Sequence, residues 1–374
     1  MKKITYILLL LFFLSSLLVP TMVYNKIFFI LLMGLLIMQK KLFNRAITLS
    51  PIIIFCIFLF GFLISFLTYS DRGLSIQFLL SVAVLFLIYP INHYQINMNE
   101  VVKFSGIIMV FFTGLMYIGL FTFKDRFPID LFPFFRDSAL GAYGSRDFID
   151  FFFHIGTVPF LFLPFSLFFL EYLTTQKKNS LLGMLVLLPV IVFSAARGLW
   201  IICLFVVLFI FLWNLKAVNR YFLILLGIPI ILTGLFFIIS DTTILSASEV
   251  SNKGKLGHIV SFFDNLGFVN FFIGGGLASF YYSKGTDAMI AHTEVTPVDM
   301  LRYFGFILTP ILYAAIIFPE RRLKYSGKNK FYLIIFGFWL LNTFTNPIMF
   351  NSYGLLVVLW YWSKMLEKDT LVQP

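Results

Sequence analysis

Apolar runs of about twenty residues recur along almost the whole chain, and no other feature constrains the fold as strongly. A helix needs about 20 mostly apolar residues to cross the hydrocarbon core of a membrane. The sequence therefore predicts an all-α polytopic membrane protein with about 12 (10–14) transmembrane helices in a single integral membrane domain, residues 1–374. The runs lie near residues 4–19, 22–38, 47–69, 74–91, 104–122, 151–173, 180–196, 198–215, 221–239, 303–319, 331–347 and 352–363.

Composition agrees with this fold class. Hydrophobic residues make up 60% of the 374 residues and charged residues 12%, whereas about a quarter of a soluble domain is charged. Both cysteines, Cys56 and Cys203, lie in apolar runs, so neither a disulfide framework nor a cysteine metal site is predicted. The exofacial segments contain no HExxH, DxD or Cys/His ligand spacing, and we expect no metal and no cofactor.

The distribution of lysine and arginine sets the orientation of the predicted helices. With a cytoplasmic N-terminus, the cytoplasmic loops and both termini hold 17 of the 28 Lys and Arg residues, as the positive-inside rule requires. Both termini are therefore predicted to be cytoplasmic, and the first apolar run is predicted to be a retained helix, because it lacks a small-x-small cleavage site. The same bias explains the net charge of +11, so no nucleic-acid partner is predicted.

The remaining cations lie on the side that the rule disfavours. Nine of these eleven fall on three exofacial elements: the loop 123–150, the turn at Arg197 and the large loop 240–302. Cations kept on this side indicate an anionic ligand, and scattered solvated charges are the alternative interpretation. The candidate diphosphate- or glycan-binding cations on the two loops are Arg136, Arg146, Lys284 and Arg302.

Arg197, in the sequence SAARGLW, stands alone between two apolar runs. An arginine within the membrane costs about 2.5 to 3.5 kcal/mol on insertion scales unless it faces a cavity or a partner. The planar guanidinium is suited to bidentate binding of phosphate. We therefore expect Arg197 to bind a phosphate group, and a side chain that reaches the outer headgroups is the alternative.

The densest polar chemistry lies in the stretch Phe271–Phe306, at the end of the large loop. Gly274–Gly276, of which Gly275 and Gly276 are candidate substrate contacts, either present amide N–H groups to phosphate or form a plain turn. His292 is a candidate general base, because an imidazole titrates near neutral pH, and a solvated loop histidine is the alternative. Thr296-Pro297 is typical of a helix start, which places Asp299 and Arg302 on one helix. Before this stretch, apolar residues at helical spacing from Leu256 to Leu266 predict a short amphipathic helix at the membrane interface.

Three of these motifs together resemble the O-antigen ligase and polymerase (Wzy-like) superfamily. They are an SxxRG-type turn between two mid-chain helices, a glycine-rich GGGLASF element in a large exofacial loop, and a histidine just before a helix reading L-x-x-x-G (Leu301–Gly305). Members of the superfamily are multi-helix membrane enzymes of bacterial surface-polysaccharide assembly. The resemblance implies that Arg197 handles a lipid diphosphate and that His292 is the loop histidine. The family commonly has Asn after that histidine, where this chain has Thr293, and the other candidate cations match no motif.

The resemblance favours a repeat-unit polymerase for O-antigen or capsule, a metal-independent glycosyltransferase. It would move a growing glycan from undecaprenyl diphosphate onto a sugar hydroxyl of another lipid-linked repeat unit. The reaction would take place at the outer face of the bacterial cytoplasmic (inner) membrane, towards the periplasm or cell exterior. The implied partners are undecaprenyl-diphosphate-linked oligosaccharides and membrane lipids, with a chain-length regulator protein as a further candidate.

Three other functions stay open. An O-antigen ligase would transfer the glycan to lipid A core or to a protein. A flippase or transporter for lipid-linked oligosaccharides would spread charges over several helices and often has two similar halves, and neither pattern is clear here. A glycosyltransferase that uses monophosphate-linked sugars usually has acidic residues in its first exofacial loop, and the loop Pro20–Lys26 has none.

Overall fold

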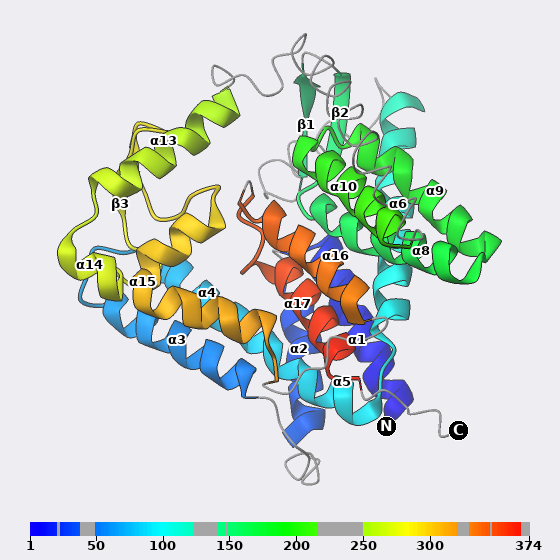
Figure 1. Cartoon of the computed structure of the whole chain (residues 1–374), viewed down its shortest axis with the longest axis horizontal. Helices are drawn as coiled ribbons and strands as arrows, with labels where there is room; N and C mark the ends of the chain where they lie inside the picture. The colour runs from blue at the N-terminus through cyan, green and yellow to red at the C-terminus, as the bar shows by residue number, and fades with distance from the viewer. Residues whose placement is uncertain are drawn as a thin grey trace. The chain divides into compact units, whose positions relative to one another are not determined.

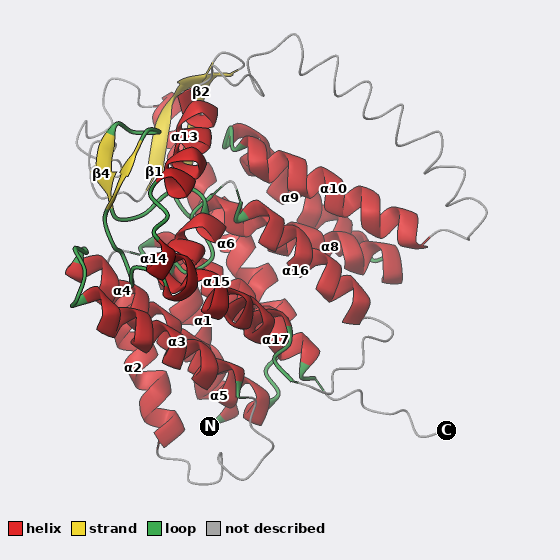
Figure 2. Cartoon of the chain, turned by 60° about the vertical axis from the view of Figure 1, so that its left-hand side comes forward, coloured by secondary structure: helices red, strands yellow, loops and turns green. Residues whose placement is uncertain are grey.

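The computed structural model describes residues 1–20, 23–37, 49–122, 141–146, 149–214, 250–320, 329–344 and 346–367. Helices dominate this part of the chain (Figure 1, Figure 2). The chain divides into two compact units, which are described separately below. Unit 1 comprises Met1–Val101, Gly257–Phe336 and Thr343–Pro374, and unit 2 comprises Val102–Leu256 and Gly337–Asn342.

Unit 1 combines the helices of both chain ends with most of the large loop. Its helices are α1 (Lys2–Leu18), α2 (Tyr24–Ile37), α3 (Ser50–Ser65), α4 (Arg72–Val82), η2 (Ala83–Leu87), α5 (Ile88–Tyr94), most of α13 (Val250–Asp264), α14 (Phe268–Ile273), α15 (Thr296–Ile317), the first half of α16 (Asn329–Asn342) and α17 (Ser352–Met365). A short antiparallel hairpin joins β3 (Tyr281–Ser283) to β4 (Ala288–Ile290), with Tyr281 opposite Ile290.

Helix α17 forms the buried centre of unit 1. Trp360, Tyr361 and Trp362 are all fully buried. The ring of Tyr361 stacks on that of Phe336 with centroids 4.0 Å apart, and the indole N–H of Trp362 donates to the carbonyl of Ile316 at 2.7 Å. Aromatic side chains with a polar tip are stable in a core when that tip finds a partner, so these rings account for a C-terminal helix that is buried among its neighbours.

Unit 2 is built on a core of apolar helices. They are most of α6 (Met98–Thr122), η3 (Val158–Leu161), α8 (Phe162–Thr175), α9 (Lys178–Phe193) and α10 (Arg197–Asn214). A hairpin pairs β1 (Gly141–Arg146) with β2 (Ile149–Ile155) in antiparallel register. The hydroxyl of Tyr117 on α6 lies 2.6 Å from the carbonyl oxygen of Phe153 and 2.7 Å from that of Phe193, which ties this hairpin and the end of α9 to α6.

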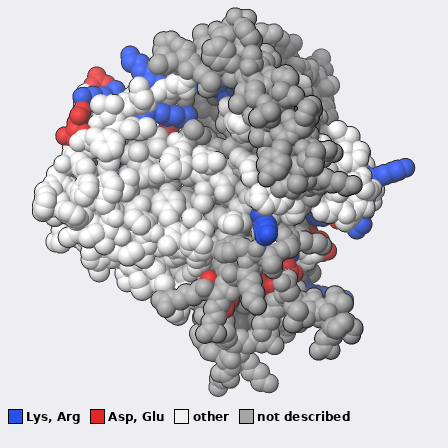
Figure 3. Space-filling model, viewed as in Figure 1, with Lys and Arg blue, Asp and Glu red and all other residues white. Residues whose placement is uncertain are grey.

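The mostly helical membrane fold is confirmed, although the prediction of spans is confirmed only in part. Among the described residues, four helical stretches are long and apolar enough to cross a membrane: Arg72–Tyr94, Met98–Ile118, Val158–Thr175 and Thr296–Ile317. Shorter apolar helices cover Tyr24–Ile37, Ser50–Ser65, Lys178–Phe193 and Arg197–Trp213. Figure 3 shows that described charged side chains gather over α13 and its hairpin, while the surface over α3 and α15 is uncharged. The number of about twelve spans and their orientation stay predictions.

The run 74–91 forms one stretch of changing helix type. The stretch is α-helical over α4, tightens to a 3-10 helix in η2 and becomes α-helical again in α5. Pro90 lies near the start of α5. Because proline has no N–H and its ring clashes with the carbonyl four residues earlier, a regular α-helix cannot run through this point.

The predicted helix from residue 151 was wrong in its first part. Residues Ile149–Ile155 form strand β2, and helix α8 begins only at Phe162, after the 3-10 turn η3. The strand sequence IDFFFHI is rich in aromatic and β-branched residues, which favour a pleated backbone, and Pro159 starts the turn that follows. Two β-hairpins therefore accompany the helices among the described residues. The predicted helix 221–239, most of the loop 123–150 and the first part of the loop 240–302 lie outside the described residues.

Candidate active site

The site begins with a break in helix α15. Helix α15 starts at Thr296 with Pro297 in its first turn, as predicted, but Gly305 has a φ of 68° and a ψ of −176° inside it. This backbone region is essentially confined to glycine. The break leaves carbonyl groups of the preceding turn without helical partners, and the Thr309 hydroxyl donates to the carbonyl of Met300 at 2.9 Å. A Cβ on Gly305 would clash with the carbonyl oxygen of Phe272, so the break also requires a close approach of backbones.

The triple glycine pairs with the carbonyls that this break frees. The N–H of Gly275 donates to the carbonyl of Arg302 at 2.8 Å, and the N–H of Gly276 donates to that of Tyr303 at 3.1 Å. Gly274 and Gly276 have φ values of 83° and 82°, which favour glycine. The three amides are used inside the protein, since Gly274 bonds to the carbonyl of Asn270. This supports the interpretation of a turn over that of an amide cradle for phosphate.

The chain after the glycines lies along the connection between α3 and α4. Leu277 donates its N–H to the carbonyl of Gly61 at 3.0 Å, and Phe280 donates to the carbonyl of Tyr69 at 2.9 Å. The hydroxyl of Thr68 donates to the carbonyl of Gly275 at 2.8 Å. Residues more than 200 positions apart in the sequence are thus held together by backbone hydrogen bonds, on segments that the charge pattern predicts to share the exofacial side.

Arg302 and Asp299 form a buried ion pair at the start of α15. The guanidinium Nη2 lies 3.0 Å from Asp299 Oδ1, and the two side chains are 8% and 6% exposed. Nη1 and Nη2 also donate to the carbonyls of Ser279 and Ala291. The guanidinium lies over the rings of Tyr281 and Tyr303, 4.4 and 4.7 Å from their centroids. A buried charge needs such pairing and hydrogen bonding to be tolerated, so Arg302 is a structural centre of this region.

The loop that carries His292 is fixed to α15 on both sides of the histidine. Before it, the carbonyl of Ala291 accepts from Arg302 and from the hydroxyl of Tyr303. After it, the N–H of Thr293 donates to Asp299 Oδ2 at 2.8 Å, and the Thr293 hydroxyl accepts from the N–H of Val295 at 3.0 Å. Thr293, where the superfamily commonly has Asn, is fully used in shaping this loop.

His292 combines exposure with a fixed proton. Its side chain is 45% exposed, and its Nδ1 lies 2.8 Å from the carbonyl oxygen of Thr293. Because a carbonyl can only accept, this bond requires the hydrogen of the neutral imidazole on Nδ1, which leaves Nε2 as the proton acceptor. Asp299 Oδ2 lies 4.0 Å from the same Nδ1, close enough to stabilise an imidazolium. An imidazole held in one tautomer beside a buried carboxylate can act as a general base.

Helix α13 packs on the β3–β4 hairpin. A helix is thus confirmed in the stretch where one was predicted, while its place at the membrane interface stays a prediction. His258 and Ser283 are buried, and His258 Nδ1 lies 2.6 Å from the Ser283 hydroxyl. Burial lowers the pKa of His258 from its ordinary value, although the carboxylates of Glu294 and Asp299 oppose the shift. Gly257 approaches the backbone of Gly285 so closely that a built Cβ would lie 2.5 Å away. These contacts make the hairpin and α13 one packed piece.

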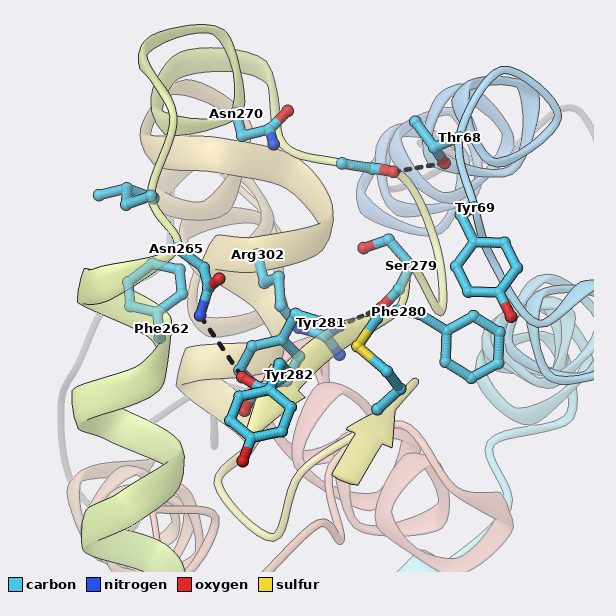
Figure 4. Close-up of a pocket in the computed structure, with 13 residues that line it drawn as sticks. Thr68, Tyr69, Phe262, Asn265, Asn270, Ser279, Phe280, Tyr281, Tyr282 and Arg302 are labelled. Atoms are coloured by element: carbon cyan, nitrogen blue, oxygen red, sulfur yellow. Dashed lines mark hydrogen bonds between the residues drawn. The ribbon is translucent and has the colours of Figure 1, made fainter. Parts of the chain in front are cut away.

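A pocket of about 370 Å³ opens beside Arg302 within unit 1 (Figure 4). Its wall combines aromatic rings, two amide side chains and the guanidinium, and Gly275 contributes backbone. Arg302 Nε is buried and has no hydrogen-bond partner among the described residues. The lining residues are Thr68, Tyr69, Phe262, Asn265, Leu266, Asn270, Gly275, Ser279, Phe280, Tyr281, Tyr282, Met289 and Arg302.

Three other candidate cations were predicted on the two exofacial loops. Lys284 pairs with Asp264 at 2.6 Å on the surface, with both side chains at least half exposed. Arg146 ends strand β1 in unit 2, and Arg136 lies outside the described residues. The site roles of these three cations stay predictions.

Arg197 is the first residue of α10 in unit 2. Ser194 and Ala195 before it are fully buried, Ala195 has a φ of 52°, and the Ala196 N–H donates to the Ser194 hydroxyl at 3.2 Å. The small residues of SAARG therefore allow a tight turn between α9 and α10. The role of Arg197 and its place beside the His292 region stay predictions.

Sequence reasoning missed the pocket and most of its wall. Tyr281, Asn265 and Asn270 carry no motif, and only their positions around the hairpin bring them together. The i, i+3 spacing of Asp299 and Arg302 on a predicted helix does indicate their ion pair, since residues at this spacing share a helix face. Among the described residues, no group of three or more His, Cys, Asp or Glu side chains could hold a metal ion.

Comparison with known proteins gives one informative similarity. Over 358 residues the chain is 25% identical to an O-antigen polymerase of Shigella flexneri, and the match covers 88% of this chain and 85% of that protein. The resemblance to the Wzy-like superfamily is confirmed. No protein-family model matches the chain, and no solved structure matches it. The similarity spans both units, so it extends well beyond the motifs between residues 180 and 310.

Proposed function

We propose that the protein is a polysaccharide polymerase of bacterial surface-glycan assembly. The observation that carries this proposal is the similarity to an O-antigen polymerase over most of both chains. The arrangement of His292, Asp299 and Arg302 adds a site whose chemistry suits glycosyl transfer. The substrates would be undecaprenyl-diphosphate-linked oligosaccharides, and the reaction would take place at the outer face of the cytoplasmic membrane.

In this mechanism His292 is the general base. Nε2 takes the proton of an acceptor sugar hydroxyl, and the hydroxyl oxygen forms a bond to the anomeric carbon of the growing glycan. The bond from that carbon to the diphosphate breaks, and undecaprenyl diphosphate leaves with the electron pair. Asp299, 4.0 Å from Nδ1, stabilises the imidazolium that forms. Base catalysis of this kind contributes about 10²- to 10⁴-fold in rate.

Arg197 is the proposed contact for the departing diphosphate. It stands at the N-terminus of α10, where backbone N–H groups and the helix dipole also favour an anion. Positive charge placed where negative charge develops lowers the barrier to leaving-group departure. Arg302 is a weaker candidate for this role, because Asp299 already balances its charge.

The test supplies the purified protein, in lipid, with the undecaprenyl-diphosphate repeat unit as its sole substrate. A polymerase gives a ladder of products that differ by one repeat, with one undecaprenyl diphosphate released per new linkage. In a second reaction that also contains lipid A core or an acceptor protein, transfer only to that acceptor would show a ligase instead. Movement of the intact lipid-linked unit across a vesicle membrane, without a new linkage, would show a flippase. Either result overturns the proposed function.

A further inference from the structure

The lining of the pocket beside Arg302 carries no net charge once Asp299 is counted with it. Arg302 is the one ionisable cation in its lining, and no Asp or Glu side chain lines it. Asp299 Oδ1, 3.0 Å from Nη2, balances the guanidinium from within the protein. A diphosphate carries several negative charges and is bound through charge-assisted hydrogen bonds from unpaired cations. The electrostatics of the pocket therefore disfavour a diphosphate.

The free donor of Arg302 has the wrong geometry for phosphate but suits a hydroxyl. Bidentate binding of phosphate needs two parallel N–H groups. Nη1 and Nη2 already donate to Ser279, Ala291 and Asp299. Both hydrogens of Nη2 are thus used, so no parallel pair of N–H groups is free. The N–H of Nε, which is buried and without a partner among the described residues, remains as a donor. A single N–H donor in a pocket wall binds one oxygen of a neutral ligand.

The amide side chains supply the complementary acceptors. Asn265 directs both amide hydrogens to carbonyls, that of Ser261 at 2.7 Å and that of Tyr282 at 3.4 Å. Its Oδ1 thus remains an acceptor for a hydroxyl hydrogen. Figure 4 shows Asn270 on the far side of the pocket from Tyr282. Because hydroxyl groups both donate and accept, a sugar ring can satisfy Nε and both amides together.

Aromatic rings form much of the remaining wall. Tyr69 and Phe280 lie with ring centroids 4.8 Å apart, and the Tyr282 hydroxyl is held by Asp287, which fixes its ring. Rigid aromatic walls with a few placed polar groups are the usual composition of small-molecule pockets, and about 370 Å³ lies at the small end of their range. The volume limits the occupant to a short stretch of glycan.

We propose that this pocket binds an uncharged sugar ring of the lipid-linked glycan, and that the diphosphate is bound elsewhere. The inference rests on the polymerase function proposed above. The charge pattern of the sequence made Arg302 a candidate for binding either diphosphate or glycan. In this proposal Arg302 contacts glycan through Nε, and its ion pair with Asp299 shapes the loop of His292.

The test measures binding and chain extension with one set of full-length variants in lipid nanodiscs. Met289→Trp fills the pocket from β4, and Thr286→Trp places the same bulk on the exposed hairpin turn, outside the pocket wall. The binding probe is the repeat-unit oligosaccharide released from its lipid by mild acid, titrated calorimetrically. Asn270→Ala is a second, milder variant that removes one polar group.

We expect Thr286→Trp to bind like wild type, Met289→Trp to bind roughly tenfold or more weakly, and Asn270→Ala to bind about 3- to 10-fold more weakly. Inorganic pyrophosphate should not displace the oligosaccharide. Displacement by pyrophosphate would overturn the inference, as would wild-type affinity in both Met289→Trp and Asn270→Ala. If these variants bind normally while wild type still makes a product ladder, the pocket assignment fails and the polymerase stands. A wild type without a ladder removes the polymerase function itself.

Discussion

Replacing Asp299 with Asn should strongly destabilise unit 1. The substitution keeps the size of the side chain but removes the charge that faces Arg302 at 3.0 Å, where the two side chains are only 8% and 6% exposed. Removing one partner of a buried ion pair leaves the other charge uncompensated and costs about 3–5 kcal/mol. Since Arg302 keeps its bonds to Ser279 and Ala291, we expect the lower end of that range.

The assay is equilibrium unfolding of the purified protein, with Asp264→Asn as the matched control. Asp264 pairs with Lys284 at 2.6 Å, but these side chains are 50% and 59% exposed. An exposed pair contributes about 0.2–1 kcal/mol. The two variants make the same chemical change at a similar distance, so the difference between their free energies of unfolding isolates the effect of burial.

A double-mutant cycle completes this test. The pair Asp299→Leu with Arg302→Met removes both charges and should be less destabilising than Asp299→Leu alone, because no unpaired charge remains. Equal losses for Asp299→Asn and Asp264→Asn would refute the reasoning. So would strict additivity of the two single substitutions in the cycle.

Three further predictions concern the backbone, pH and the diphosphate. Gly305→Ala should lower the free energy of unfolding by about 1–3 kcal/mol or more, because the φ of 68° suits glycine and the new Cβ would meet Phe272. The control Gly337→Ala, with no atom within 4 Å of the new Cβ, should change that free energy by no more than about 1 kcal/mol. Unfolding midpoints compare the two variants. Burial lowers the folded-state pKa of His258 below its ordinary 6.5, so the folded state favours the neutral imidazole and stability should fall as the pH drops below 6.5. In a melting-temperature profile between about pH 8 and pH 5, His258→Gln should flatten this fall. An unchanged slope in the variant would show that His258 does not cause it. Arg197→Lys keeps the charge but loses the bidentate fork, so chain extension should slow by about tenfold or more in rate assays with lipid-linked substrate, and a rate equal to wild type would remove Arg197 from the diphosphate site.

Local patterns were sufficient to predict the helices that carry the site. Thr296-Pro297 predicted the start of α15, and helical spacing of apolar residues predicted α13. Both signals depend only on residues that are neighbours in the sequence. The same reasoning put Asp299 and Arg302 on one helix, and their ion pair follows from that spacing.

The parts that depend on distant contacts could not be predicted in this way. Strands β3 and β4 have three residues each, too few for an alternating pattern, and they are held by α13 and by the connection after α3. The break at Gly305 looked like a single glycine in a helix, and it matters because Gly275 and Gly276 bond to the carbonyls that it frees. The pocket wall combines Tyr69 with residues near 280, and neither segment contains a sequence pattern that predicts its contact with the other.

The most direct test of the account is the rate of chain extension by His292→Ala. The measurement uses purified protein and lipid-linked repeat units, with Thr286→Ala on the nearby hairpin turn as the control. Each variant is first shown to have the same unfolding midpoint as wild type. We predict a rate about 10²- to 10⁴-fold below wild type for His292→Ala and an unchanged rate for the control. Equal rates for His292→Ala and wild type would show that this loop does not supply the base, and the central claim would be wrong.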